Sequence, residues 1–285
     1  MNNVGFDIRQ METGDLPAAM DIKNQERWNQ TLYDWEHLLN DQSGICLVAT
    51  LRDKVVATVS AIGYNNKLAW IGMMLVRKEH RGQGLAKMLM HAILEKLVEY
   101  PAIKLDATPA GFPVYAGLGF VPEYSIWRMT RISAAHSPAP IAQTLPLIEK
   151  SLQDITDYDQ RVYGVKRTHL LQYLHQQSPD TVRIAGGKKS IKGYIMGRPG
   201  TNYHQLGPLL ADSTTAAIDL ISSALSQHRE QPIVVDVLAD KEEMITWLKT
   251  HGFTVQRELI RMYYQNNLFS GDLPQQFLIS GPELG

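Results

Sequence analysis

Cysteine is almost absent from this chain. Cys46 is the single cysteine among 285 residues, which excludes an internal disulfide framework. It lies in the apolar run "ICLVAT", a context typical of a buried small side chain rather than of a nucleophile. No apolar run approaches the ~18 residues that cross a bilayer, and the start of the chain holds no apolar signal core. We therefore expect a cytoplasmic protein without a membrane partner.

An excess of charge of one sign is missing as well. The chain has 28 Lys and Arg against 29 Asp and Glu, and this balance holds on both sides of residue 132. Proteins that bind nucleic acid usually concentrate basic residues on one face, so nucleic acid is not an expected partner. The 9 histidines are scattered without the spacing of metal ligands, so the sequence predicts no metal site.

What the chain does have is hydrophobic material for packed cores, 44% of its residues, in a pattern that alternates strands and helices. Such alternation predicts an α/β or α+β fold with a mixed central sheet flanked by helices. Segment 133–146, "SAAHSPAPIAQTLP", interrupts the pattern with prolines and small residues, and predicts a linker. Ahead of this linker the expected strands are 6–11, 44–51, 55–64, 68–76, 103–107 and 124–132, and the expected helices are 15–25, 84–99 and 113–118.

The second half of the chain repeats the first. "IKLDATPAGFPVYAGLGF" is similar to "IVVDVLADKEEMITWLKTHGF", and Asp106 in the first segment corresponds to Asp236 in the second. Arg128 corresponds to Arg261 at almost the same separation. Several identities at a nearly constant offset indicate two copies of one fold.

The two expected domains are 1–132 and 147–285, on either side of the linker. "GMMLV" at 72–76 corresponds to "GPLLA" at 207–211, and the second copy is shorter beyond this point. There it has "DSTTAA", with no glycine and no arginine, in place of the glycine loop of the first copy. The sequence of this segment, an aspartate followed by "STT", predicts a helix capped by its own side chains.

The glycine loop of the first copy is "VRKEHRGQGLAKMLM", residues 76–90. It contains Gly82 and Gly84, two residues that are costly to order. A strand, a glycine loop and a helix start form the usual arrangement for holding an anion, because the first amides of a helix have no intrahelical partner and lie at the positive end of the helix dipole. Arg81 would add positive charge.

Two common phosphate motifs do not fit this loop. A P-loop ends in Gly-Lys-Ser/Thr, whereas Gly84 is followed by Leu85 and Ala86. A dinucleotide fingerprint needs a third glycine where this chain has Lys87.

A third motif fits. Arg-x-x-Gly-x-Ala, here Arg81, Gly84 and Ala86, resembles the coenzyme A pyrophosphate loop of the GNAT N-acetyltransferase superfamily. The segment "VYAGLGF", 114–120, resembles the Tyr-x-x-x-Gly-Phe segment of the same family, with Tyr115 in the tyrosine position. Both motifs occur in the family's order, with a strand and a helix start around the loop. The chain thus resembles a tandem GNAT protein whose second domain is degenerate.

The resemblance implies acetyl-coenzyme A as the cofactor. In the family, the loop amides bind the pyrophosphate and the strand before the loop binds the pantetheine arm through its backbone. Thr108 stands where many members have an asparagine near the pantetheine, and a threonine hydroxyl can still form a hydrogen bond there. The implied cofactor-binding residues are Met74, Val76, Arg81, Gly82, Gln83, Gly84, Leu85, Ala86 and Thr108.

Tyr115 is the candidate acid of the reaction. A phenol has a pKa near ~10, so it is protonated at neutral pH and can donate to a leaving thiolate. No general base is evident from the sequence. Asp106 could point at the acceptor, but Asp236 takes the same place in the degenerate copy, which favours a structural role for both.

The acceptor-side wall is expected in "QERWNQTLYDW", residues 25–35. Trp28 lies among polar residues, a poor context for a core position, and Tyr33 and Glu26 belong to the same segment. Aromatic rings beside carboxylates suit an acceptor that carries an ammonium group. The predicted acceptor-binding residues are Glu26, Trp28, Tyr33 and Asp106.

These interpretations together predict an N-acetyltransferase that moves acetyl from acetyl-coenzyme A to a primary amine by direct attack in a ternary complex. The acceptor is a small molecule or a peptide amine. The expected role of the second domain is to cover the acceptor site or to build a homodimer contact. The alternative is a non-catalytic acyl-coenzyme A-binding regulator or assembly protein, which would share the glycine loop but would not need Tyr115.

Overall fold

The structure is a computed structural model that describes residues 5–132, 144–146, 151–187 and 190–285. Most of the expected linker, 133–143, lies outside the described residues. Its last three residues, Thr144–Pro146, form the short strand β7 rather than an irregular connection.

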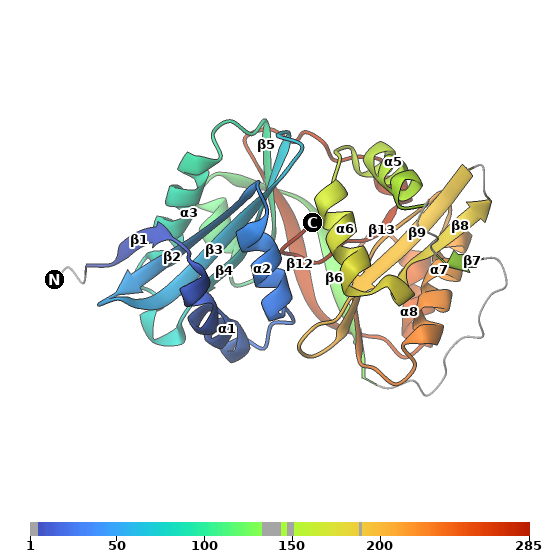
Figure 1. The fold of residues 1–285 in the computed structure, drawn as a ribbon, viewed down its shortest axis with the longest axis horizontal. Helices are drawn as coiled ribbons and strands as arrows, with labels where there is room; N and C mark the ends of the chain where they lie inside the picture. Colours follow the sequence, from blue (N-terminus) through green and yellow to red (C-terminus); the bar gives the residue numbers. More distant parts are fainter. Residues whose placement is uncertain (1–4, 133–143, 147–150, 188–189) are drawn as a thin grey trace.

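The N-terminal half follows the predicted order of strands and helices (Figure 1). One helix that was not expected is added to this order. Among the expected elements the largest difference in bounds is at the last strand, which begins at Phe120 instead of residue 124 and ends at Arg131. The elements of this half are β1 (Asp7–Gln10), α1 (Leu16–Gln25), α2 (Leu32–Asn40), β2 (Gly44–Leu51), β3 (Lys54–Tyr64), β4 (Leu68–Val76), α3 (Leu85–Lys96), β5 (Ala102–Ala107), α4 (Phe112–Ala116) and β6 (Phe120–Arg131).

Helix α2 was not expected from the sequence, although its start carries a local signal. The Thr31 side chain accepts a hydrogen bond from the Asp34 amide, and the Asp34 side chain accepts one from the Thr31 amide. This reciprocal pair is a capping box, which satisfies two amides that the helix itself leaves without partners. Thr31 and Asp34 stand at the spacing by which such boxes are recognised.

The C-terminal half has the same alternation. Its elements are β7 (Thr144–Pro146), α5 (Ser151–Tyr163), α6 (Thr168–Gln177), β8 (Arg183–Gly187), β9 (Ser190–Arg198), β10 (His204–Ala211), α7 (Thr214–Gln227), β11 (Ile233–Leu238), α8 (Glu242–Thr250), β12 (Thr254–Tyr264) and β13 (Gln276–Leu278). Of the helices that the structure describes, none has the length and apolar character needed to span a membrane.

The mixed α/β fold is as expected, but the central sheets of the two halves are joined into one. The 13-stranded sheet has the order β1-β2-β3-β4-β5-β12-β6-β11-β13-β10-β9-β8-β7. Strand β12 of the C-terminal half thus pairs with β5 of the N-terminal half, and β6 of the N-terminal half pairs with β11 of the C-terminal half. Figure 1 shows β6 and β12 running side by side between the two halves. Each half therefore gives its last long strand to the other.

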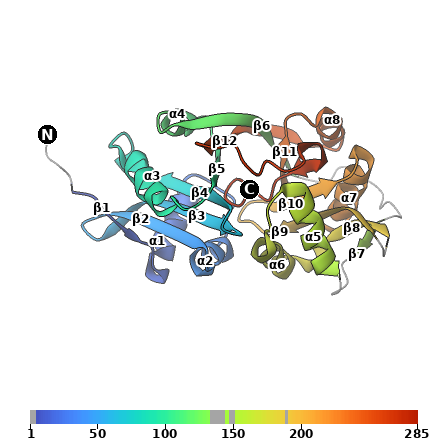
Figure 2. The same ribbon diagram turned by 90° about the horizontal axis from the view of Figure 1, so that it is seen from above.

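Helices cover both faces of the N-terminal part of the sheet (Figure 2). Successive residues of a strand point to opposite faces, and β2 shows this directly. Cys46 packs with the cluster that includes residues of α1 and α2, whereas Leu47 packs with the cluster that includes α3. Cys46 is buried, as the sequence predicts, and burial raises the pKa of its thiol to about 12.

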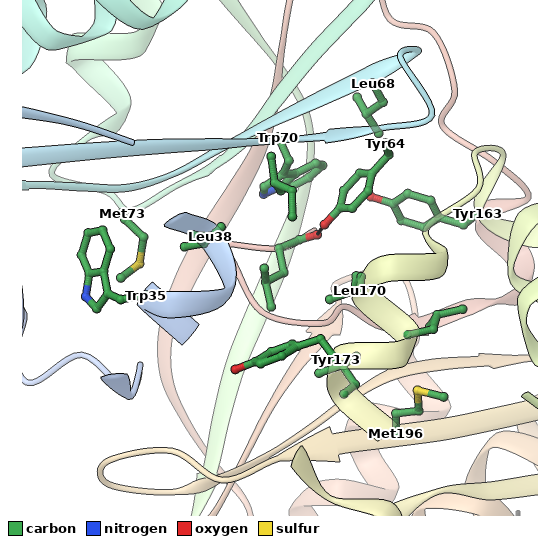
Figure 3. Packing of buried hydrophobic residues seen from close by; sticks show 14 of the residues in the cluster. Trp35, Leu38, Tyr64, Leu68, Trp70, Met73, Tyr163, Leu170, Tyr173 and Met196 are labelled. Carbon is green, nitrogen blue, oxygen red and sulfur yellow. Dashed lines mark hydrogen bonds between the residues drawn. The ribbon is translucent and has the colours of Figure 1, made fainter. Parts of the chain in front are cut away.

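A hydrophobic core also joins the two halves (Figure 3). Trp35 and Leu38 of α2 belong to the same buried cluster as Leu170 and Tyr173 of α6. The Tyr173 hydroxyl donates to Asp34 Oδ1 across this core at 2.9 Å. The shared core and the exchanged strands fix the second half against the first, where the candidate site lies.

Candidate active site

Strands β4 and β5 lie parallel and paired only along part of their length. Residues 68–71 of β4 pair with 102–105 of β5, and within the described residues the pairing ends there. The register between β3 and β4 then shifts, and Met73 takes a φ of 51°, as expected of a bulge. Strands β4 and β5 diverge from this point. The backbone of Met74 and Val76, the predicted pantetheine contacts, therefore has no β5 neighbour.

The loop after β4 ends at Gly84, the residue that precedes α3. Gly82 has a φ of 74° and Gly84 a φ of 83°, a left-handed conformation that glycine adopts at little cost. A Cβ built at either position would meet no atom within 4 Å. The space in front of this loop is therefore open.

The amides of the loop have no acceptor in the part of the chain that the structure describes. No side chain caps α3, and among the described residues the amides of 82–86 donate no hydrogen bond. They lie at the positive end of the helix dipole, so they can bind an oxyanion directly. Leu85 is buried and anchors the first turn, while the loop before it is exposed. A row of unpaired amides with open space in front fits the diphosphate of coenzyme A.

Arg81 lies beside these amides and contacts Glu26. Arg81 Nη2 is 2.7 Å from Glu26 Oε1, and Lys78 Nζ is 3.8 Å from the same oxygen. Gln83 Nε2 donates to the carbonyl of Glu79 at 3.3 Å, which ties the loop back to its own start. Glu26, predicted to contact the acceptor, thus lies at the cationic edge of the loop.

A narrow cavity of about 30 Å³ opens where β4 and β5 diverge. Five of the residues predicted from the sequence line it together: Trp28, Met74, Asp106, Thr108 and Tyr115. The structure thus brings the candidate acid, two of the three predicted pantetheine contacts and two of the predicted acceptor-binding residues to a single place.

Tyr115 belongs to the short helix α4, whose start is held by Thr108. The Thr108 hydroxyl accepts a hydrogen bond from the Gly111 amide at 3.2 Å. The Tyr115 ring is buried and lies edge-on to Phe120, with ring centroids 6.1 Å apart. Burial raises the pKa of the Tyr115 phenol, so its hydroxyl stays protonated throughout the neutral range.

Asp106 is already paired. Arg261 Nε donates to Asp106 Oδ1 at 2.9 Å, and Arg261 Nη2 donates to Oδ2 at 3.0 Å. On the other side of the exchanged strands, Arg128 binds both oxygens of Asp236 in the same way, at 2.7 Å each. Both aspartates are thus held in buried ion pairs, which is the kind of structural role that the repeat favoured for them.

Tyr33 is not brought to the cavity. It lies on α2 with 61% of its surface exposed, and lines a separate groove with residues of α6. Of the four predicted acceptor-binding residues, Trp28 and Asp106 line the cavity, Glu26 lies at the loop, and Tyr33 lies elsewhere.

The C-terminal half completes the cavity, which the sequence did not predict. Arg257 and Leu259 of β12 line it, as do Pro282 and Glu283 from the segment after β13. Glu283 is buried, accepts a hydrogen bond from Gln30 at 2.7 Å and forms an ion pair with Arg198. The exchange of β12 and the course of the chain after β13 place these residues here, so no local sequence pattern could have identified them.

The corresponding loop of the second half differs. Ser213 caps α7, and its hydroxyl accepts a hydrogen bond from the Ala216 amide at 3.2 Å. Asp212 does not form the cap and instead accepts from the Tyr158 hydroxyl at 2.7 Å. An amide that bonds to its own cap is not free for a diphosphate.

Comparison with known proteins gives consistent matches in both halves. Residues 7–120 match the model of the acetyltransferase (GNAT) family, and residues 155–278 match that of an acetyltransferase (GNAT) domain. An uncharacterized N-acetyltransferase of Bacillus subtilis, YitH, is 26% identical over 70% of this chain and 71% of its own length. The holothin acyltransferase of a Pseudoalteromonas species is 25% identical over 84% of this chain and 81% of its own length.

Solved structures share the fold over nearly the whole chain. A protein of Pyrococcus horikoshii superposes with a TM-score of 0.83 at 20% identity, over 100% of this chain and 98% of its own. A tandem GNAT protein from the clavulanic acid biosynthesis pathway superposes with a TM-score of 0.64 at 11% identity, over 91% of this chain and 98% of its own. At these identities the likeness is one of fold.

Proposed function

The chain belongs to the GNAT acetyltransferase family, with one GNAT domain in each half, and we propose that its N-terminal half transfers an acyl group, acetyl by default, from acyl-coenzyme A to a primary amine. The observation that supports this most is the cavity where β4 and β5 diverge. Tyr115 and Thr108 line it together with Met74, beside a helix start with unpaired amides. We also propose the division of the chain into domains 1–132 and 147–285.

In this proposal the residues of the loop, 81–86, hold the diphosphate through their amides and the Arg81 guanidinium. The backbone of Met74 and Val76 and the Thr108 hydroxyl hold the pantetheine arm. When bound, acyl-coenzyme A supplies an activated thioester, whose acyl carbon is open to attack by an amine. The divergence of β4 from β5 leaves the backbone of Met74 and Val76 free for these contacts.

Tyr115 holds a proton at its hydroxyl oxygen for the departing sulfur. Its burial keeps that proton in place at neutral pH, because a buried phenol loses its proton less readily than an exposed one. Trp28 and the residues of β12 exclude water from the cavity and orient the amine. The amine attacks directly, since no residue of the cavity suggests a covalent acyl-enzyme.

The test is to mix the purified chain with acetyl-coenzyme A and a panel of primary amines. The panel covers amino acids, polyamines, aminoglycosides and lysine peptides. Release of the coenzyme A thiol above the rate of hydrolysis, with the acetylated amine identified by mass spectrometry, supports an enzyme. Propionyl- and butyryl-coenzyme A are included because one relative is named as an acyltransferase. Binding of the coenzyme without turnover of any amine favours the non-catalytic regulator instead.

We expect Tyr115→Phe to lower kcat by about 100-fold and to leave coenzyme affinity unchanged, because a single acid–base group usually contributes on this scale. Steady-state kinetics and calorimetric titration measure the two quantities. Tyr33→Phe is the matched control, since Tyr33 lies outside the cavity and should behave as wild type. If kcat of Tyr115→Phe stays within about twofold of wild type while chemistry limits the rate, another group protonates the sulfur.

We also expect one coenzyme A to bind per chain. In the second half the Ala216 amide is capped by Ser213, and the Asp212 carboxylate lies beside the position that a diphosphate would need. Two negative groups there repel each other. Calorimetric titration of coenzyme A should give a stoichiometry of one, and two equivalent sites would contradict this prediction.

A further inference from the structure

Arg257 is a cation in the cavity that has no partner among the residues that the structure describes. It belongs to β12, and it lines the cavity together with Tyr115, Thr108 and Trp28. Its Nε is buried and makes no hydrogen bond, and among the described residues no carboxylate lies within ion-pair distance of its guanidinium. A guanidinium presents five donors in a planar fork, and among the described residues none of those of Arg257 is bonded to a protein acceptor.

The carboxylates around Arg257 are bound to other arginines. Asp106 lines the same cavity but binds Arg261 through both oxygens, at 2.9 and 3.0 Å. Glu283 also lines it and is paired with Arg198 and Gln30. No acidic side chain of the cavity is therefore left over for Arg257.

The surroundings of Arg257 disfavour its charge. In the β12–β6 ladder it lies opposite Arg128, a like charge that is itself bound to Asp236. Burial, with a contribution from Arg128, lowers the pKa of Arg257 to about 10 in spite of the attraction of Asp236 and Glu283. A charge that is partly buried without a partner costs free energy, which a ligand of opposite charge would recover.

The diphosphate of the coenzyme does not need Arg257. The loop at the start of α3 has its own amides and its own cations, Arg81 and Lys78, which share the Glu26 carboxylate. Arg257 precedes Ile260, which pairs with Ala107 at the carboxyl end of β5, and no residue of the loop lines the cavity that Arg257 lines. The pantetheine arm carries no charge, so an anionic ligand for Arg257 would come from the acceptor.

We infer that Arg257 binds a carboxylate of the acceptor, so that the acceptors are primary amines that also carry a carboxylate, as amino acids do. This inference rests on the proposed function. A planar carboxylate fits the guanidinium fork through two parallel hydrogen bonds. The C-terminal half thereby selects the substrate of the N-terminal half.

The experiment compares amines that differ only in this group: alanine, β-alanine, glutamate and lysine, each against its carboxamide. O-phosphoethanolamine is added as a bulkier anionic amine. Because amidation also changes the pKa of the amine, preference is judged from the change between variants and not from wild type alone. In Arg257→Met, the ratio of kcat/KM for the preferred acid over its amide should fall by about 10-fold or more, mainly through KM.

Arg257→Lys should keep part of the preference, since it retains the charge but not the fork. Arg229→Met is the matched control, because Arg229 is exposed in the second half and lies outside the cavity. A second measurement does not depend on turnover. Calorimetric titration of the N-acetyl acids and N-acetyl amides, with coenzyme A present, should show tighter binding of the acid in wild type and equal binding in Arg257→Met.

The inference is overturned if the acid-to-amide ratio in Arg257→Met stays within about twofold of wild type, or if the variant loses only O-phosphoethanolamine. Acetylation of neutral amines without any effect of Arg257 would leave the proposed function standing and remove this inference. If wild type acetylates no amine, the proposed function fails, and the calorimetric comparison alone decides whether Arg257 binds carboxylates.

Discussion

Replacement of Gly84 by valine is expected to weaken coenzyme A binding by at least about 100-fold while the chain stays folded. At Gly84 the backbone has a φ of 83°, which a β-branched residue adopts only with strain. The new side chain would also project into the open space in front of the amides, where no atom lies within 4 Å of the Cβ position. An oxyanion could then no longer approach those amides. Calorimetric titration with coenzyme A measures the loss.

Gly14→Val is the matched control for this substitution. Gly14 also has no atom within 4 Å of its Cβ position, but it has an ordinary φ and lies outside the loop, before α1. The Gly14→Val variant should bind coenzyme A with the affinity of wild type. Thermal unfolding of both variants verifies that they are folded. Wild-type affinity in folded Gly84→Val would mean that the loop is a structural turn and that the coenzyme binds elsewhere.

Arg261→Met should lower the free energy of unfolding by about 3–5 kcal/mol, because it leaves a buried carboxylate without its partner. The buried Arg261 guanidinium donates to both oxygens of Asp106 and to the Tyr124 hydroxyl, the latter at 2.7 Å. It also lies over the Trp70 ring, 4.4 Å from its centroid. These contacts join β12 of one half to the strands of the other. Denaturant unfolding of the whole chain measures the change.

The double variant Asp106→Leu, Arg261→Met tests whether the unpaired charge is the cause. Removing both partners leaves no buried carboxylate alone, so the double variant should be more stable than Arg261→Met by itself. A loss below about 1 kcal/mol in Arg261→Met would contradict the prediction, as would a double variant that is less stable than the single one.

Much of the N-terminal half was predictable because its signals are local. The glycine loop is an example, since Gly82 and Gly84 do lie between a strand that ends at Val76 and a helix that begins at Leu85, and both have a left-handed backbone. The strand at 68–76 has the predicted bounds, because a continuous apolar run followed by the loop marks both of its ends. Helix α2 was not predicted, although the spacing of Thr31 and Asp34 in the sequence is that of the capping box with which the helix begins.

The internal repeat showed which residues correspond in the two halves but not which of them are in contact. Asp106 and Asp236 correspond to each other, as do Arg128 and Arg261, and this correspondence favoured structural roles. It did not say which arginine binds which aspartate. In the structure each aspartate binds the arginine of the other half, at Asp106–Arg261 and Asp236–Arg128. An internal repeat is equally compatible with two separate sheets and with exchanged strands.

The sequence by itself determined the α/β alternation, the two copies and the glycine loop that ends at Gly84, because each depends on backbone propensity and on the spacing of neighbouring residues. Only the tertiary structure decided which strands pair across the halves, and therefore that Arg257 and Glu283 line the cavity of Tyr115. The physical reason is that β6 and β12 expose the same backbone donors and acceptors to any neighbouring strand. Their choice of partner depends on side-chain packing and buried ion pairs between residues more than a hundred positions apart in the chain.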